Sequence, residues 1–284
     1  MTFPTASDYS EGKIKACHSV LIELVHILGD YVDDMAIVGG WVPTLLIPNA
    51  EEVHIGSMDV DVALNGETIS DEAYATINKI LTRHGYRENE AANAKFKHFK
   101  DITIDGQDYI VEVDLLTGEY GGEAGKNRRH EPIQDTKALK ARGADLVFDR
   151  TETIVVSGDL PGNAGKDSVK CKIAGIVPFI VMKGIVIARR IKEKDAYDID
   201  FVLRNYPGSV TAIAELMTVD LQNGLVLEAL SNLEQKFETV EHWGPTAVAD
   251  FREIGDIDER ERVKRRAFEN VQNLLNKTLR SKSH

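Results

Sequence analysis

Residues 56–61, Gly-Ser-Met-Asp-Val-Asp, contain the side chains best suited to chemistry. Acidic and apolar residues alternate from Asp59 to Val62, a pattern typical of a strand with one acidic side. Asp59 and Asp61 are therefore expected to point the same way. Two carboxylates this close repel each other and favour a cation between them. Magnesium suits such a site, because it takes oxygen ligands and commonly binds carboxylates together with substrate phosphates.

Two short glycine-containing segments come before these acids in the sequence. Gly56 and Ser57 come directly before them, and Gly39 and Gly40 follow the short apolar run 35–38. A glycine lets the backbone approach a phosphate closely, and a serine hydroxyl can donate a hydrogen bond to it. These residues are candidates for binding a nucleotide.

A third acid fits the same site. Residues 111–116 alternate between apolar and polar side chains, with Asp114 near the end of the run. If this strand lies beside the first, Asp114 joins Asp59 and Asp61. Three carboxylates can hold two metal ions, which would activate an attacking hydroxyl and stabilise a leaving phosphate.

A lysine in the second half of the chain is a further candidate. Lys183 lies within residues 176–188, which are apolar on nearly every face, so the helix is expected to be buried. A buried charge is unfavourable without a partner; snorkelling to the surface is the alternative. Replacing Lys183 with methionine is expected to keep or raise stability. Asp195 and Asp198 follow, three residues apart on one helical face.

The hydrophobic pattern predicts an α+β fold: a mixed sheet with helices, followed by a helical C-terminal region. The expected domains are residues 1–170, the core, and 171–284, which completes the active site. Strands are predicted at 35–38, at the alternating run 59–62 within 53–64, and at 95–104, 109–116, 146–156 and 168–173. Helices are predicted at 13–28, 41–46, 71–84, 135–142, 176–192, 195–206, 210–217, 225–239 and 259–279, with a glycine-rich, mobile segment at 118–125.

The ordered set Gly39-Gly40, Gly56-Ser57-x-Asp59-x-Asp61 and Asp114 resembles the polymerase-beta-type nucleotidyltransferase superfamily. Lys183, the downstream arginine and Lys194-Asp195-x-x-Asp198 are similar to the second half of the AbiEii-type nucleotidyltransferases, which include toxins of bacterial toxin–antitoxin pairs. The resemblance covers residues 35–206, and the region from 207 to 284 resembles no family.

The resemblance implies transfer of a nucleoside monophosphate from a nucleoside triphosphate to an acceptor hydroxyl, with release of pyrophosphate. Mg²⁺, with Mn²⁺ as an alternative, would be the cofactor. A tRNA end or other RNA is the first expected acceptor, and an antitoxin protein an expected partner. A small-molecule or protein acceptor, or an inactive nucleotide-binding protein, is the alternative. The implied site comprises metal ligands Asp59, Asp61 and Asp114, the further catalytic residues Lys183 and Asp198, and nucleotide-binding residues Gly39, Gly40, Gly56, Ser57, Lys183 and Asp195.

Composition limits the class of protein. Of 284 residues 43% are hydrophobic and 28% charged, which fits a soluble globular chain. We expect no membrane span, no secretory signal and, with two cysteines, a reducing cytoplasm. The net charge is −12, but residues 260–284 carry eight basic and two acidic side chains. Arg262, Arg265 and Arg266 are therefore expected to bind RNA phosphates, unless they pair with the acidic body.

Overall fold

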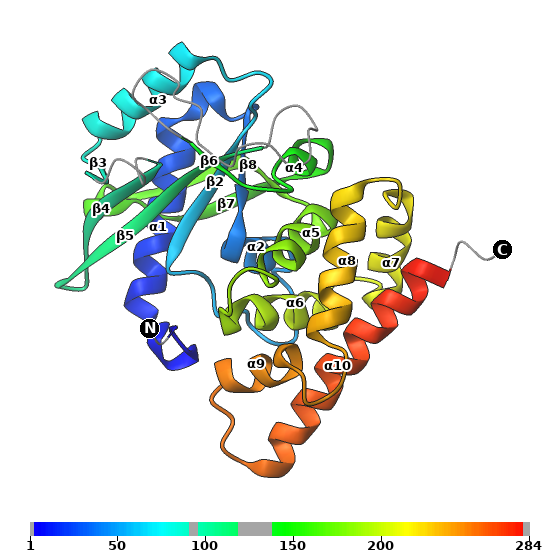
Figure 1. Ribbon diagram of the computed structural model, residues 1–284. Helices are drawn as coiled ribbons and strands as arrows, with labels where there is room; N and C mark the ends of the chain where they lie inside the picture. The colour runs from blue at the N-terminus through cyan, green and yellow to red at the C-terminus, as the bar shows by residue number, and fades with distance from the viewer. Residues whose placement is uncertain (1–2, 91–95, 119–137, 281–284) are drawn as a thin grey trace. The chain divides into compact units, whose positions relative to one another are not determined.

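The computed structural model describes residues 3–90, 96–118 and 138–280, which form two compact units (Figure 1). One unit, called the sheet unit below, comprises Ser10–Leu45 and Gly56–Gly175. The other, called the helical unit, comprises Met1–Tyr9, Leu46–Ile55 and Ile176–His284. The segment Leu46–Ile55 thus leaves the sheet unit and returns to it directly before the Gly56-Ser57 turn.

The sheet unit is built on a mixed sheet, which has eight strands in the part of the chain described. The strand order is β3-β4-β5-β2-β1-β8-β7, and β6 pairs with β5. Strands β2 and β5 run parallel, whereas β1 and β2 run antiparallel. The strands are β1 (Met35–Val38), β2 (Asp59–Leu64), β3 (Arg87–Glu88), β4 (Lys97–Ile104), β5 (Gln107–Thr117), β6 (Leu139–Lys140), β7 (Thr151–Asp159) and β8 (Lys166–Ala174).

Helices cover this sheet and connect its strands. Helix α1 packs across it, in contact with β2, β4, β5, β7 and β8 (Figure 1). Its start is fixed by Ser10, whose side chain accepts a hydrogen bond from the backbone of Lys13. The helices are α1 (Glu11–Ile27), α2 (Val42–Leu46), α3 (Asp71–Arg83) and α4 (Asp145–Asp149), with short 3₁₀ turns at Gly29–Tyr31, Gly39–Trp41 and Pro161–Asn163.

The helical unit contains six α-helices among its described residues, and its longest, α10, contacts α6, α7, α8 and α9 (Figure 1). Helix α5 is buried along almost its whole length, as expected from its apolar sequence. The helices are α5 (Ile176–Val186), α6 (Glu193–Asn205), α7 (Ser209–Val219), α8 (Gly224–Lys236), α9 (Trp243–Phe251) and α10 (Ile257–Arg280), preceded by a 3₁₀ turn at Ala6–Asp8.

These elements confirm the predicted α+β class, with a mixed sheet and a helical C-terminal region. The domain boundary at 170 stays a prediction, and the glycine-rich segment 118–125 lies almost wholly outside the described residues. No helix in the described part of the chain is both long and apolar enough to cross a membrane.

Two element predictions were wrong, and one helix was missed. Within the predicted helix 135–142, residues Leu139–Lys140 instead form a strand, because they extend the sheet beside β5. Residues Asp145–Asp149 are helical where a strand was expected. Helix α9 was not predicted, since Pro245 and Gly244 are poor helix formers, although Pro is tolerated near a helix start.

Candidate active site

Strand β2 presents its acidic side chains on one side. Asp59 and Asp61 are partly exposed, whereas Val60 and Val62 between them are fully buried. This difference follows from the two-residue period of a strand. The sequence thus puts an apolar side of β2 into the core and both carboxylates on the opposite side.

Strand β5 continues the acidic surface. It pairs with β2 in parallel, so that Asp59 lies opposite Glu112 and Asp61 opposite Asp114. Residues directly opposite each other in a sheet project to the same side. Four carboxylates of two neighbouring strands therefore share one side of the sheet, and we call them the acidic face: Asp59, Asp61, Glu112 and Asp114.

A lysine on the next strand partly neutralises the acidic face. Lys97 of β4 lies opposite Asp114, and its ammonium pairs with the carboxylate of Glu112 and, at 3.1 Å, with that of Asp114. Sequence reasoning missed both Lys97 and Glu112. The alternation of residues 111–116 already puts Glu112 on the same side as Asp114, so this acid could have been found.

The environment of Asp114 disfavours its ionised form. Burial raises its pKa to about 6, and although Lys97 opposes this shift, the charges of Glu112 and Asp59 add to it. One ammonium thus does not offset the crowding of carboxylates on this face. A cation bound on this face would relieve the repulsion between Asp114 and its neighbouring carboxylates.

Gly39 lies directly against this face. Its φ is +69°, a left-handed conformation that favours glycine, and a side chain there would overlap the carboxylate of Asp61. Gly40 and Trp41 complete the same 3₁₀ turn, and the Trp41 indole donates a 2.9 Å hydrogen bond to the backbone carbonyl of Asp59. The glycine turn and the acidic strand therefore hold each other in place.

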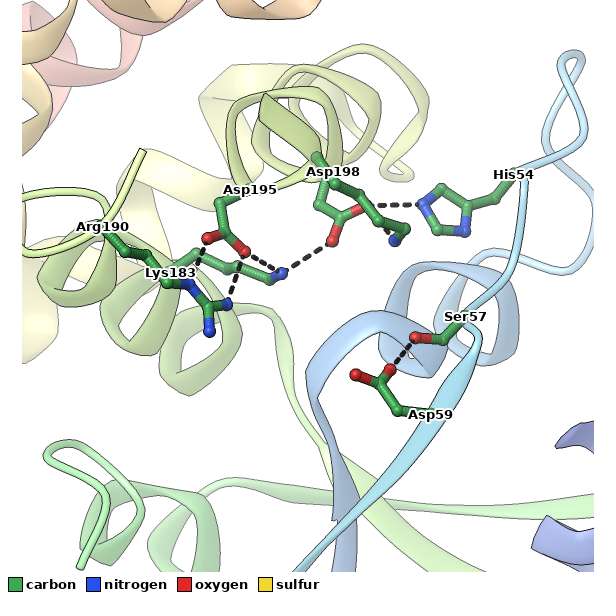
Figure 2. A network of polar contacts seen from close by, with 8 residues as sticks. His54, Ser57, Asp59, Lys183, Arg190, Asp195 and Asp198 are labelled. Atoms are coloured by element: carbon green, nitrogen blue, oxygen red, sulfur yellow. Dashed lines mark hydrogen bonds and ion pairs between the residues drawn. The ribbon is translucent and has the colours of Figure 1, made fainter. Parts of the chain in front are cut away.

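The turn before β2 is equally constrained. Gly56 has a φ of +85°, and the hydroxyl of the buried Ser57 donates a 2.5 Å hydrogen bond to Asp59 (Figure 2). This contact orients the Asp59 carboxylate. Ser57, Asp59, Asp61, Gly39 and Gly56 therefore belong to one continuous arrangement in the sheet unit.

The oxygen ligands of the acidic face suit a hard divalent cation. Within residues 3–90, 96–118 and 138–280, however, no three or more His, Cys, Asp or Glu side chains are grouped so that they could hold a metal. Asp59 and Asp61 could hold such a cation together with substrate oxygens. Asp114 pairs with Lys97, and its role as a third metal ligand stays a prediction.

The helical unit holds a second cluster, centred on the two predicted acids of α6 (Figure 2). Lys183 of α5 pairs with both, at 2.7 Å from Asp195 and 2.7 Å from Asp198. Both carboxylates are fully buried. The charge of Lys183, unusual in so apolar a helix, is therefore compensated, and its pKa is raised, since the two carboxylates outweigh the opposing effect of burial.

Three further side chains complete what we call the buried ion-pair cluster. Lys194 pairs with Asp198 at 2.7 Å, and Arg190 with Asp195 at 2.8 Å. The buried imidazole of His54 lies 3.0 Å from Asp198. Burial lowers the pKa of His54 to about 4, against the influence of Asp198, so the ring is neutral near pH 7.

These contacts correct one expectation about Lys183. Its replacement by methionine would leave two fully buried carboxylates each short of a partner 2.7 Å away. Removing one member of a buried ion pair typically destabilises a protein by about 3–5 kcal/mol. We therefore expect Lys183→Met to destabilise the fold, which the sequence could not indicate without the partners.

Several basic residues of helix α10 pair with acidic side chains. Arg262 pairs with Glu259 at 2.5 Å, and the buried Lys264 pairs with Glu241 and Glu261. Arg265 is exposed. Much of the basic charge of this helix is thus matched by acids, so a role in RNA binding stays a prediction.

Comparison with known proteins identifies no family. No family model matches the chain, and no curated protein matches it. Among solved structures, an antigenic nucleotidyltransferase-like protein from Paracoccidioides brasiliensis is 16% identical with a TM-score of 0.45, covering 80% of this chain and 89% of that one. JHP933 from Helicobacter pylori is 12% identical with a TM-score of 0.45, covering 96% of each chain.

Proposed function

We propose that the protein is a metal-dependent nucleotidyltransferase that transfers a nucleoside monophosphate from a nucleoside triphosphate to an acceptor hydroxyl. One observation carries the proposal: four carboxylates of two neighbouring strands share one side of the sheet, beside a glycine turn in which Gly39 has no room for a side chain against Asp61. Paired acids beside a glycine turn suit a triphosphate bound with a cation.

The residues of the sheet unit take distinct roles in this proposal. Asp59 and Asp61 would hold Mg²⁺ or Mn²⁺, and Ser57 fixes the orientation of Asp59. The ion would polarise the reacting phosphate and favour the acceptor alkoxide. Gly39 and Gly40, with Gly56, would let phosphate oxygens approach the backbone. Asp114, held by Lys97, would keep the face negative.

The roles of Lys183, Asp195 and Asp198 follow from their family resemblance rather than from their contacts. Because two carboxylates hold Lys183, we assign it and Asp198 mainly to positioning. Arg190 differs from them, since its side chain is 48% exposed while it pairs with the buried Asp195. Among the charged residues of this cluster, Arg190 is thus well suited to meet a phosphate.

A transfer assay tests the proposal. Purified protein is incubated with each α-labelled nucleoside triphosphate, Mg²⁺ and either tRNA, total protein or a panel of small hydroxyl compounds. Label on an acceptor with stoichiometric pyrophosphate supports the proposal, and the labelled acceptor identifies the substrate class. Triphosphate binding without transfer to any acceptor would instead favour an inactive nucleotide-binding protein.

We propose RNA, specifically a tRNA end, as the first acceptor to examine, because positive charge is concentrated in α10 of an acidic chain. Affinity for RNA should fall with salt by a slope of roughly −0.7 per phosphate contacted. Arg262→Ala/Arg265→Ala should lower both slope and affinity. Unchanged values would exclude these two side chains from an RNA site and favour a small-molecule or protein acceptor.

A toxin role would appear as slowed growth. Expression of the parent in bacteria should arrest growth, expression of Asp61→Asn should not, and co-expression of a cognate antitoxin should restore it. Normal growth under parent expression would argue against a toxin while leaving transfer to be decided by the assay above.

A further inference from the structure

Three arginines of the helical unit converge on two acids. Arg204 of α6 bonds to Asp200 at 2.9 Å and to Glu52 at 2.6 Å. Arg252, directly after α9, lies 3.3 Å from Glu52, and Arg266 of α10 lies 3.7 Å from Asp200. Helices far apart in sequence thus bring three guanidinium groups to one place, and we call these five residues the arginine cluster.

The arginine cluster is positively charged overall, because three guanidiniums face two carboxylates. The charged groups of the cluster shift one another's pKa values. Burial lowers the pKa of Arg266, Asp200 opposes this, and Arg204 and Arg252 lower it further. Burial would raise the pKa of Glu52, but the arginines outweigh it and lower it. The acids hold the guanidiniums together without cancelling their mutual repulsion.

Several donors of the arginine cluster are left without an acceptor. The buried nitrogens Nη2 of Arg204, Nη1 of Arg252, and Nε and Nη2 of Arg266 have no hydrogen-bond partner among the described residues. The buried Oδ1 of Asp200 also lacks one. A buried donor without a partner costs roughly 1–3 kcal/mol. Four such donors on three neighbouring guanidiniums are better explained by an absent acceptor than by packing.

We propose that the arginine cluster binds the oxyanion of a phosphate group. Guanidinium donors are planar and match phosphate oxygens in pairs, which a point charge such as lysine does not. Such an anion would satisfy the open donors and neutralise the excess positive charge. Neither effect depends on the nucleotidyltransferase activity proposed above, so this site stands independently of it.

The cluster is accessible from solvent at one end. The side chains of Arg266, Glu52 and Arg252 are 41%, 34% and 27% exposed, whereas Asp200 is fully buried. Arg204 and Asp200 therefore form the floor of the site, and Arg266 its most exposed wall. Because the open nitrogens are covered, the proposal requires the exposed Arg266 side chain to turn aside as a phosphate enters.

Titration of the full-length chain with inorganic phosphate, at constant ionic strength in chloride, tests the site by calorimetry and by thermal unfolding. We expect saturable binding of one phosphate per chain and a rise in melting temperature. Arg266→Gln and Arg252→Gln should each weaken binding by roughly tenfold or more, as expected for loss of a charge-assisted pair. Arg266→Lys should restore affinity only in part.

Lys277→Gln is the control, since it removes one positive charge from another exposed position of α10. It should bind phosphate as the parent does. Absence of phosphate binding to a folded parent, or equal weakening by Lys277→Gln and Arg266→Gln, would overturn the proposal. Circular dichroism of each variant checks folding, and Arg252→Gln provides the second test if Arg266→Gln unfolds.

A second arm identifies the source of the phosphate. Single-stranded RNA is titrated with and without inorganic phosphate. RNA affinity that drops with Arg266→Gln and with added phosphate assigns the site to a nucleic-acid backbone. If Arg266→Gln weakens phosphate binding, but neither this substitution nor added phosphate changes RNA binding, the site is assigned to a free phosphate. Both outcomes support the site and separate its two natural ligands.

Discussion

The acidic face of the sheet unit and the buried ion-pair cluster of the helical unit use the same residue types differently. On the acidic face Lys97 pairs with Glu112 and Asp114, and burial still raises the pKa of Asp114 to about 6. In the ion-pair cluster Lys183, Lys194 and Arg190 pair with two carboxylates, and the pKa of Asp198 falls because Lys183, Lys194 and His54 together outweigh burial. In the ion-pair cluster every buried carboxylate thus has cationic partners from the protein itself, whereas the repulsion on the acidic face favours a bound cation.

The largest expected effect separates the two regions by activity. Asp61→Asn should reduce transfer by about a thousandfold or more, because it removes a ligand of the reacting cation. Its stability should hold or rise, since one of four crowded charges is lost. Turnover and urea unfolding, measured on the same preparation, test both parts of this prediction. Full activity of Asp61→Asn would show that Asp61 is not a ligand of the reacting cation.

Lys183→Met should act mainly on stability. It should lower the free energy of unfolding by about 3–5 kcal/mol, because it leaves two buried carboxylates short of a partner. Lys97→Met is the matched control on the acidic face, where the lysine is about a quarter exposed, and its effect on unfolding should be smaller. Equal destabilisation by both substitutions would contradict the contrast between the regions.

The pH dependence of stability sharpens the account of Asp114. In the folded state the pKa of Asp114 is about 6, above the usual value of 3.8, so the folded state holds the proton more tightly than the unfolded state does. The free energy of unfolding therefore falls as pH rises from about 4 to about 6 and Asp114 ionises. Asp114→Asn should remove this loss, so its advantage over the parent should grow with pH to on the order of 1–3 kcal/mol.

Unfolding of both proteins from pH 4 to 8 provides the measurement. The buried His54 and His98, whose pKa values fall to about 4, give the opposite slope in both proteins and cancel in the difference. If the difference in free energy of unfolding between the two proteins is constant with pH, the pKa of Asp114 is not raised by folding.

The smallest expected effect concerns Lys97. Its ammonium already occupies Asp114 and Glu112, so removing it should strengthen Mn²⁺ binding by roughly tenfold. Lys100→Met is the control, since Lys100 lies on β4 too but pairs with Glu23 instead. Electron paramagnetic resonance of free Mn²⁺ measures affinity without requiring turnover. Affinity unchanged by Lys97→Met would mean that Lys97 and the cation do not compete.

Much of the fold could be predicted from local sequence patterns. The alternation at Asp59–Val62 and at 111–116 gave both acidic strands, because the two-residue period depends only on local geometry. The brief strand Leu139–Lys140 could not be found this way, since only its neighbour β5 makes it extended. Helix α9 was missed because packing overrides the weak helical preference of its glycine and proline.

The sequence predicted the grouping of Ser57, Asp59 and Asp61, because their spacing alone puts them on one strand and the turn before it. Their partners were not. Lys97 looks like any strand lysine until the register sets it opposite Asp114. The arginine cluster joins residues from Glu52 to Arg266, which no local pattern connects. Long-range pairing thus decides which charges are compensated and which remain to act.

Isothermal titration of the parent and of Asp61→Asn with each nucleoside triphosphate, with and without Mg²⁺, tests the central claim most directly. We predict that at least one triphosphate binds the parent, that Mg²⁺ strengthens this binding, and that Asp61→Asn abolishes the strengthening. Circular dichroism confirms that the variant is folded. Binding by neither protein under any condition, or identical Mg²⁺ dependence in both, would contradict the assignment of the acidic face to metal-dependent nucleotide chemistry.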